Sequence, residues 1–145
     1  MGTWVGSIIF LSFVVAPGAF STLGSRDQAG AVVGMALARL HLLGGIAGGL
    51  FLVARVAQAR SLAALARPAA LLVILMLVLT LVSQQWVGAR MTHLRQEMGS
   101  VERTPENHPL RVEFNRLHRV SVQLEIAVLL AGLAALFLTV REAFS

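Results

Sequence analysis

The chain has 145 residues, of which 57% are hydrophobic and 13% are charged. Soluble domains carry about 25% charged residues, so this composition excludes an ordinary soluble protein and favours a membrane protein. All twelve basic residues are arginines, at scattered positions, which argues against a nucleic-acid-binding surface. The sequence has no cysteine, which excludes disulfides and thiolate metal sites.

Four apolar stretches have the length of about 20 residues that an α-helix needs to cross a bilayer. They cover residues 4–23, 34–54, 68–88 and 118–140. The first stretch has no basic region before it and is longer than the apolar part of a signal peptide, so we expect a retained helix. Pro17 should distort that helix, because proline removes a backbone donor. We treat residues 1–145 as a single four-helix transmembrane domain.

The connections predict an all-α integral membrane protein whose four helices form an antiparallel up-down bundle. Short loops join neighbouring helices, so residues 25–29 and 89–117 should lie on one side of the membrane. Residues 89–117 are expected to form a helical extramembrane hairpin, interrupted at Gly99 and Pro105. That side carries more arginines, which favours a cytoplasmic location for the hairpin in a bacterial inner membrane.

The second stretch carries glycines on one helical face together with His41. Its glycines form two overlapping G-x-x-x-G patterns, Gly44 with Gly48 and Gly45 with Gly49. Small residues at this spacing let membrane helices approach closely. We therefore expect His41 to point into the bundle. Arg39 should point to roughly the opposite face, and Trp4 and Trp86 are expected at the membrane interfaces.

Glu125 is the most informative residue, because a charged side chain inside a membrane helix costs about 2.5–3.5 kcal/mol. Ser121 shares its face, and Gln84 lies on the third helix. With about 1.5 Å of rise per residue, His41, Gln84 and Glu125 are expected at one depth. Burial favours a neutral carboxyl group and a nearby histidine favours a charged one, so this polar cluster could hold a proton or ligand. Alternatively, its hydrogen bonds only fix the helix register.

Histidines on two helices of a membrane bundle can also ligate haem b. The candidate ligands are His41 and His118, but His118 lies about 9 Å nearer the membrane surface than His41, which argues against the pair. We expect no cofactor and no metal site. The sequence also lacks phosphate-binding-loop and serine-hydrolase motifs, so we expect no enzymatic activity.

Two short elements resemble those of a known family. An A-P-x-x-F element ends the first helix with Ala16, Pro17 and Phe20, and an F-x-x-L-H-x-x-S element opens the last helix with Phe114, Leu117, His118 and Ser121. The chain resembles a bacterial family of small four-helix membrane proteins of unknown function, similar to transmembrane protein 205. This resemblance implies the fold and implies no reaction.

Three functions fit the sequence. The one we favour is a non-enzymatic accessory or structural subunit that packs against other membrane proteins in a larger complex. The second is a small transporter or proton-linked channel that uses His41, Gln84 and Glu125 and works as a homo-oligomer. The third is a haem b electron-transfer protein. In each case the expected partners are the lipid bilayer and membrane proteins, not nucleic acid.

Overall fold

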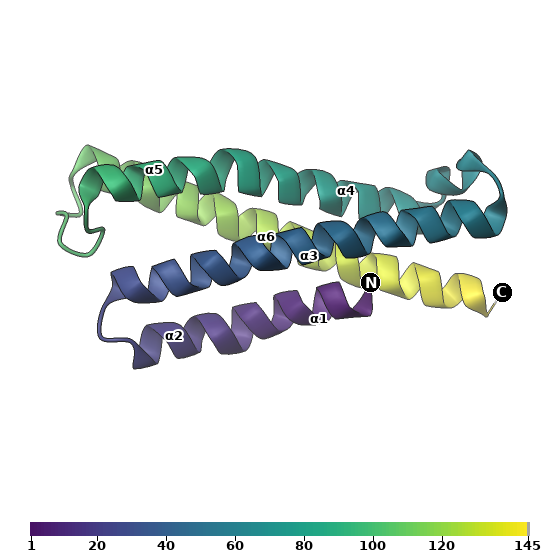
Figure 1. The fold of residues 1–145 in the computed structure, drawn as a ribbon, viewed down its shortest axis with the longest axis horizontal. Coiled ribbons are helices and arrows are strands. Elements are labelled where there is room, and N and C mark those ends of the chain that lie inside the picture. The colour runs from purple at the N-terminus through teal and green to yellow at the C-terminus, as the bar shows by residue number, and fades with distance from the viewer. Residues whose placement is uncertain (145) are drawn as a thin grey trace.

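The computed structural model describes residues 1–144, and every regular element in them is helical. In chain order the elements are α1 (Gly2–Phe10), η1 (Leu11–Val15), α2 (Ala16–Thr22), α3 (Arg26–Ala59), η2 (Leu62–Ala66), α4 (Pro68–Val82), η3 (Ser83–Gly88), α5 (Ala89–Met98) and α6 (Pro109–Ala143). Elements α1 to α2 and α4 to α5 follow each other without a break, so the chain folds into four long helical rods (Figure 1).

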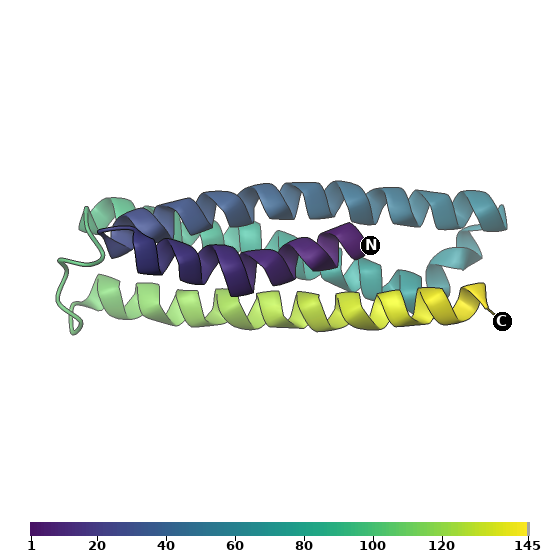
Figure 2. The ribbon, with the colours of Figure 1, turned by 90° about the horizontal axis from the view of Figure 1, so that it is seen from below.

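Each rod is long and apolar enough to cross a membrane: Gly2–Thr22, Arg26–Ala59, Pro68–Met98 and Pro109–Glu142. The rods lie side by side, and the turns that join them alternate between the two ends of the molecule (Figure 1). The turns after α2 and after α5 share one end, which we call the loop end. The first rod is shorter than the others, so the N-terminus stops well short of the opposite end (Figure 2).

The helices extend beyond the predicted spans, because a helix continues past charged residues until its backbone is interrupted. The rod α3 runs from Arg26, where the Ser25 hydroxyl accepts a hydrogen bond from the Asp27 N–H at 3.1 Å, to Ala59. It ends where Arg60 adopts a left-handed conformation. Gly99 ends α5 with a φ of 69° and a ψ of −43°, a backbone conformation that favours glycine. At 34 residues, α3 is about 51 Å long, well over a bilayer's apolar thickness of about 30 Å.

Two rods contain π-helical turns. In the first rod, η1 precedes Pro17, whose missing N–H cannot bond to the carbonyl one turn back. In the third rod, η3 begins at Ser83 and contains Gln84. Such turns inside α-helices are frequent at functional sites because they re-aim the side chains that they carry.

The apolar core forms where Trp4 packs on the glycines of α3. A side-chain carbon added at Gly44 or Gly48 would collide with the Trp4 indole, and one added at Gly48 would also press on Leu77 of α4. Trp4 is 3% exposed, whereas Trp86 is 79% exposed. The expectation that Trp4 lies at a membrane interface is therefore wrong. The short first rod starts deep in the bundle and places this indole against the middle of α3.

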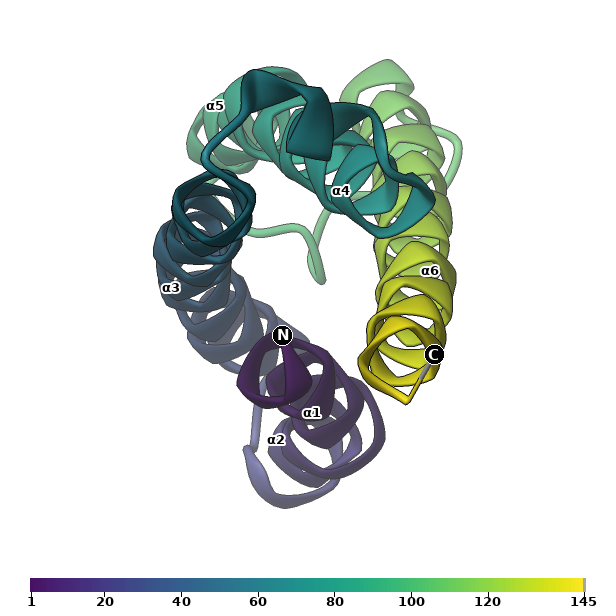
Figure 3. The same ribbon diagram turned by 90° about the vertical axis from the view of Figure 1, so that its right-hand side faces the viewer.

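Val5, the residue after Trp4, packs on the other neighbouring rod, α6. Val5 and Met76 both press on the place where Gly132 of α6 lacks a side chain. Ile8, Leu11, Leu40 and Val128 complete this buried cluster around Trp4 and Met76. Seen end-on, the first rod lies between α3 and α6, opposite α4 (Figure 3). The rods meet here through small residues, which is how helices associate when lipid supplies no hydrophobic driving force.

We predict that Gly44→Ala destabilises the protein by about 1–3 kcal/mol, because the new methyl group must displace the Trp4 indole. Unfolding of the purified protein in mixed micelles, followed by circular dichroism, would measure the change. Gly45→Ala is the matched control, because nothing lies within 4 Å of the added carbon. That control should be neutral or slightly stabilising, since alanine favours helices. Equal destabilisation by both variants would contradict the packing.

The loop end is joined by reciprocal hydrogen bonds between its two turns. The Ser100 hydroxyl and the Val101 N–H donate to the Asp27 carboxylate at 2.5 and 3.0 Å. The Glu102 carboxylate in turn accepts from the Ser25 hydroxyl at 3.1 Å and from the Arg26 N–H at 3.0 Å. Each turn therefore supplies a carboxylate that binds donors of the other turn.

The hydrogen bond from Ser100 lowers the pKa of Asp27, which precedes the apolar stretch of α3, below its ordinary value of 3.8. An acid with a lowered pKa stabilises the fold above its ordinary value, and this contribution is lost as the pH falls through the lower value. We predict that Asp27→Asn lowers the melting temperature by about 2 °C near pH 6 and by less near pH 3, which is below the ordinary pKa of 3.8.

Circular dichroism at the two pH values would check this difference. Glu106→Gln is the control, because Glu106 is exposed in the same segment and the structure gives its carboxylate no hydrogen bond among the described residues. An Asp27→Asn effect of the same size at both pH values would contradict the role of the carboxylate.

Candidate functional site: a buried histidine–glutamate pair

His41 lies at the middle of the bundle, on the face of α3 that also carries Gly44 and Gly48. The face is inward because the two glycines, one and two turns after His41, lie under the Trp4 indole. His41 is 6% exposed. Arg39, two residues earlier, is exposed on the outside of the bundle.

Both ring nitrogens of His41 bind side chains of other helices. Nδ1 lies 2.9 Å from Oε1 of Gln84 in η3, and Nε2 lies 3.0 Å from Oε2 of Glu125 in α6. Three of the four rods thus meet at one imidazole ring. The structure therefore brings together the polar residues His41, Gln84 and Glu125 that the sequence placed at one depth.

The hydrogen bonds restrict where the protons lie. An amide oxygen only accepts, so Nδ1 of His41 carries a hydrogen that it donates to Gln84. A single further proton then lies between Nε2 and Oε2 of Glu125. It belongs either to an imidazolium beside a carboxylate or to a carboxylic acid that donates to a neutral imidazole. The two forms have the same total charge, so the proton can move within the pair without moving net charge into the membrane.

The second carboxyl oxygen of Glu125 has no partner. Its Oε1 is buried and makes no hydrogen bond in the structure, and the same is true of the Trp4 indole nitrogen and the Thr80 hydroxyl. Trp4 lies against Gly44, one turn from His41, and Thr80 lies one turn before Gln84. Unsatisfied polar groups are rare in buried positions and need an explanation. Glu125 was singled out in the sequence, but the burial of Trp4 and Thr80 without partners was not predicted, because an isolated tryptophan or threonine in an apolar helix carries no signal.

The backbones of the two helix pairs lie farther apart on the loop side of this pair. There α2 packs along α3, and α5 packs along α6, but among the described residues neither α3 and α5 nor α2 and α6 have extensive backbone packing. The two helix pairs visibly diverge toward the loop end (Figure 1). Ser121 lies about one turn and His118 about two turns from Glu125 toward this end, along the same face of α6. His118 is exposed and does not reach the pair.

Both ring nitrogens of His41 are occupied by Gln84 and Glu125, so this geometry leaves neither free for a haem iron. Among residues 1–144, no group of three histidine or acidic side chains is arranged to hold a metal ion. The haem b alternative, with His41 and His118 as ligands, is not tested by the structure.

The glycines and the two family elements have distinct environments. Gly44 and Gly48 are buried under Trp4, whereas nothing lies within 4 Å of a carbon added at Gly45 or Gly49. The first element lies on α2, where Phe20 is exposed. The second element lies on α6, where Phe114 is buried, and the structure does not pack α2 along α6. The residues of these elements are Ala16, Pro17, Phe20, Phe114, Leu117, His118 and Ser121.

Residues 1–100 match the family described as domain of unknown function (DUF4149). The chain belongs to this family. No curated protein matches it. No solved structure matches it either. The match includes His41 and Gln84 but ends before α6, which carries Glu125. Together with four helices that are long and apolar enough to cross a bilayer, the family indicates a membrane protein whose function is not established.

We predict that Gln84→Leu destabilises the fold by about 0.6–1.7 kcal/mol, because His41 then loses the acceptor of its Nδ1–H. Chemical unfolding in mixed micelles would measure the loss. Gln85→Leu is the matched control. Gln85 follows Gln84 in η3, and its side chain is exposed and has no hydrogen bond in the described structure. If Gln85→Leu costs as much as Gln84→Leu, the hydrogen bond to His41 contributes nothing specific.

Proposed function

We propose that this protein is a non-enzymatic integral membrane protein that moves protons through His41 and Glu125, as a small proton-linked transporter or channel. In this proposal the four rods form an antiparallel transmembrane bundle in a bacterial inner membrane, with the hairpin of residues 89–117 in the cytoplasm. The observation that carries the proposal is the buried pair that shares one proton while its second carboxyl oxygen has no partner.

A purely structural role does not require an acid at this position. A glutamine at position 125 could donate to Nε2 of His41 and thereby link α3 to α6 without an ionisable group. An acid inside a membrane helix is costly, and ionisable residues at such depth commonly mark proton or ion pathways. Glu125 adds to the link a group that can take up and release a proton.

Access to the pair favours one side of the bundle. Toward the loop end the helix pairs diverge, and α6 presents Ser121 at the next turn. Toward the opposite end, the indole of Trp4 and the buried side chains of Met76 and Val128 fill the space between the helices. We expect protons to enter from the loop end, and the Trp4 cluster to act as the barrier that a transport cycle must open.

The test compares proton flux into vesicles that contain the purified protein and a pH-sensitive dye. The wild type should dissipate an imposed pH gradient, and Glu125→Gln should lower the rate at least about tenfold, because an amide keeps the bond to His41 but cannot release a proton. Glu142→Gln is the control for removing an acid from α6, since Glu142 pairs with Arg55 near the far end. An unchanged rate in folded Glu125→Gln would overturn the proposal.

A second candidate function is an accessory or structural subunit of a larger membrane complex. It is favoured by Gly45 and Gly49, a G-x-x-x-G pair on α3 that no other helix covers. Purification in mild detergent, followed by mass spectrometry and an absorption spectrum of the same peak, would test this alternative. Large partners in stoichiometric amounts would support it, and a colourless homo-oligomer alone would favour proton transport. An absorption band of haem that belongs to this chain would contradict both.

A further inference from the structure

Two arginines at the loop end have buried guanidinium nitrogens without a hydrogen-bond acceptor. Nε of Arg95 and both Nε and Nη1 of Arg111 are inaccessible and make no hydrogen bond among the described residues. A guanidinium group holds its charge in any protein and carries five donors, so it cannot avoid this cost by losing a proton. These three nitrogens carry four N–H bonds, and none of them has a hydrogen-bond acceptor among the described residues.

Both arginines have positions near Phe114 of α6, Arg95 in space and Arg111 one turn away along the helix. The guanidinium of Arg95, on α5, lies 5.6 Å from the centre of the Phe114 ring on α6. Arg111 lies one helical turn before Phe114, on the same face of α6. Arg95 also reaches α3, because a carbon added at Gly30 would lie 2.9 Å from its Nη2. Arg95 thus lies between α3 and α6, over an aromatic ring, and Arg111 lies one helical turn from that ring along α6.

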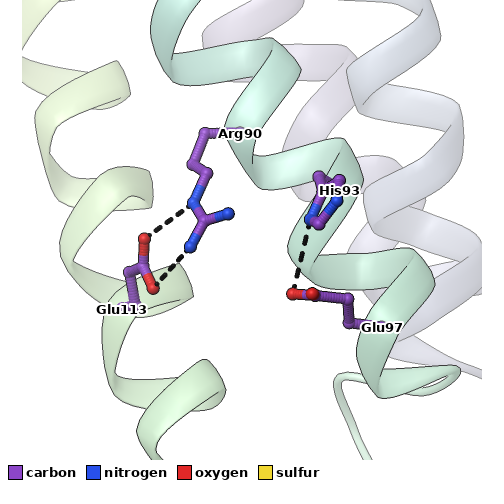
Figure 4. A network of polar contacts seen from close by, with 4 residues as sticks. All are labelled: Arg90, His93, Glu97 and Glu113. Carbon is purple, nitrogen blue, oxygen red and sulfur yellow. Dashed lines mark hydrogen bonds and ion pairs between the residues drawn. The ribbon is translucent and has the colours of Figure 1, made fainter.

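Four of the five acids of this end already bind other groups, and the fifth, Glu106, is exposed. Glu113 accepts two hydrogen bonds from Arg90 at 2.8 and 3.1 Å, and Glu97 lies 3.4 Å from the ring of His93 (Figure 4). Asp27 and Glu102 bind the turn donors described above. The hydrogen bond from Ser100 and, to a smaller extent, the charge of Arg95 lower the pKa of Asp27. No acid of the described structure bonds to the buried nitrogens of Arg95 and Arg111, so we look for their acceptor outside the chain.

We propose that Arg95 and Arg111 form a binding site for a phosphate-bearing anion at the loop end of the bundle. Phosphate oxygens match the forked donors of arginine and accept several of them at once. Arg111 lies about 21 Å along α6 from Glu125, which places it beyond the apolar part of the helix, at the level of lipid headgroups. Basic pockets between membrane helices bind anionic headgroups in this way. The same chemistry would hold a free phosphate group.

The experiment measures thermal stabilisation of the intact protein and separates the two sources of phosphate. One series adds inorganic phosphate to the protein in uncharged detergent, at constant ionic strength. The other compares nanodiscs of phosphatidylcholine alone with nanodiscs that also contain phosphatidylglycerol. Stabilisation by phosphatidylglycerol only identifies a lipid headgroup, and stabilisation by inorganic phosphate as well identifies a site open to free anions.

Arg111→Gln should weaken the apparent affinity at least about tenfold, because it removes charge-assisted hydrogen bonds to the anion. Arg116→Gln, which removes an exposed arginine of the same helix, should leave it unchanged. If Arg95→Gln does not fold, Arg111→Gln still tests the site, since the buried Nε and Nη1 of Arg111 make no hydrogen bond within the described structure. Absence of stabilisation in both series, or an equal effect of Arg116→Gln, would overturn the site. Proton flux through Glu125 is measured separately and does not enter this result.

Discussion

The imidazole of His41 is the point on which the arrangement of this bundle depends. Each ring nitrogen is held by a side chain from a different rod, Gln84 on the third and Glu125 on the fourth. In the interior of a membrane, water does not compete for these groups, and each unmet donor or acceptor costs several kcal/mol. The three rods therefore have to keep the depth and rotation at which the bonds form. Because the pair also shares a proton, the same contact that fixes the helices can respond to proton uptake.

The bundle has two halves with different physical character on either side of this ring. On one side the first rod packs through Trp4 and Val5 onto glycines of both neighbours, and the interior is apolar and close-packed. On the other side the helix pairs separate and are joined by polar contacts, first at His41 and finally between the two turns at the loop end. Close packing is rigid, whereas hydrogen bonds between long polar side chains can exchange partners. Motion of the bundle is therefore expected on the loop side.

The sequence predicted the helices and the polar cluster well, because both depend on periodicity and on rise per residue. His41, Gln84 and Glu125 lie at about the same distance from the loop end of their rods, 15, 14 and 16 residues from Arg26, Met98 and Pro109. Trp4 was placed wrongly because its depth was judged from the end of its apolar stretch. The distance from the turn determines which residues of the two helices meet. Trp4 and Gly44 both lie 20 residues from Gly24, so a tight helical hairpin puts them together.

The environments of Arg95 and Arg111 could not be predicted in the same way. Their charges alternate with those of nearby acids along residues 89–117, a pattern typical of a solvated surface. The structure sorts these charges onto two faces. Arg90 pairs with Glu113 and His93 with Glu97 on one face, whereas Arg95 lies over the ring of Phe114 on the other, and the buried nitrogens of Arg111 have no hydrogen-bond partner in the described structure. This sorting depends on how far α5 and α6 stand from α3, and one-dimensional spacing does not contain that distance.

The family match divides the site in a way that bears on its chemistry. Residues 1–100 include His41 and Gln84, the donor and acceptor that fix the ring, whereas Glu125 comes from α6, beyond the match. With His41 and Gln84 alone, the ring would be oriented, with Nδ1–H toward the amide oxygen and Nε2 without the partner that Glu125 supplies. The residue that faces Nε2 then decides what the ring does. An amide there would give a fixed link between helices, and an acid, as in this chain, adds a proton that can leave.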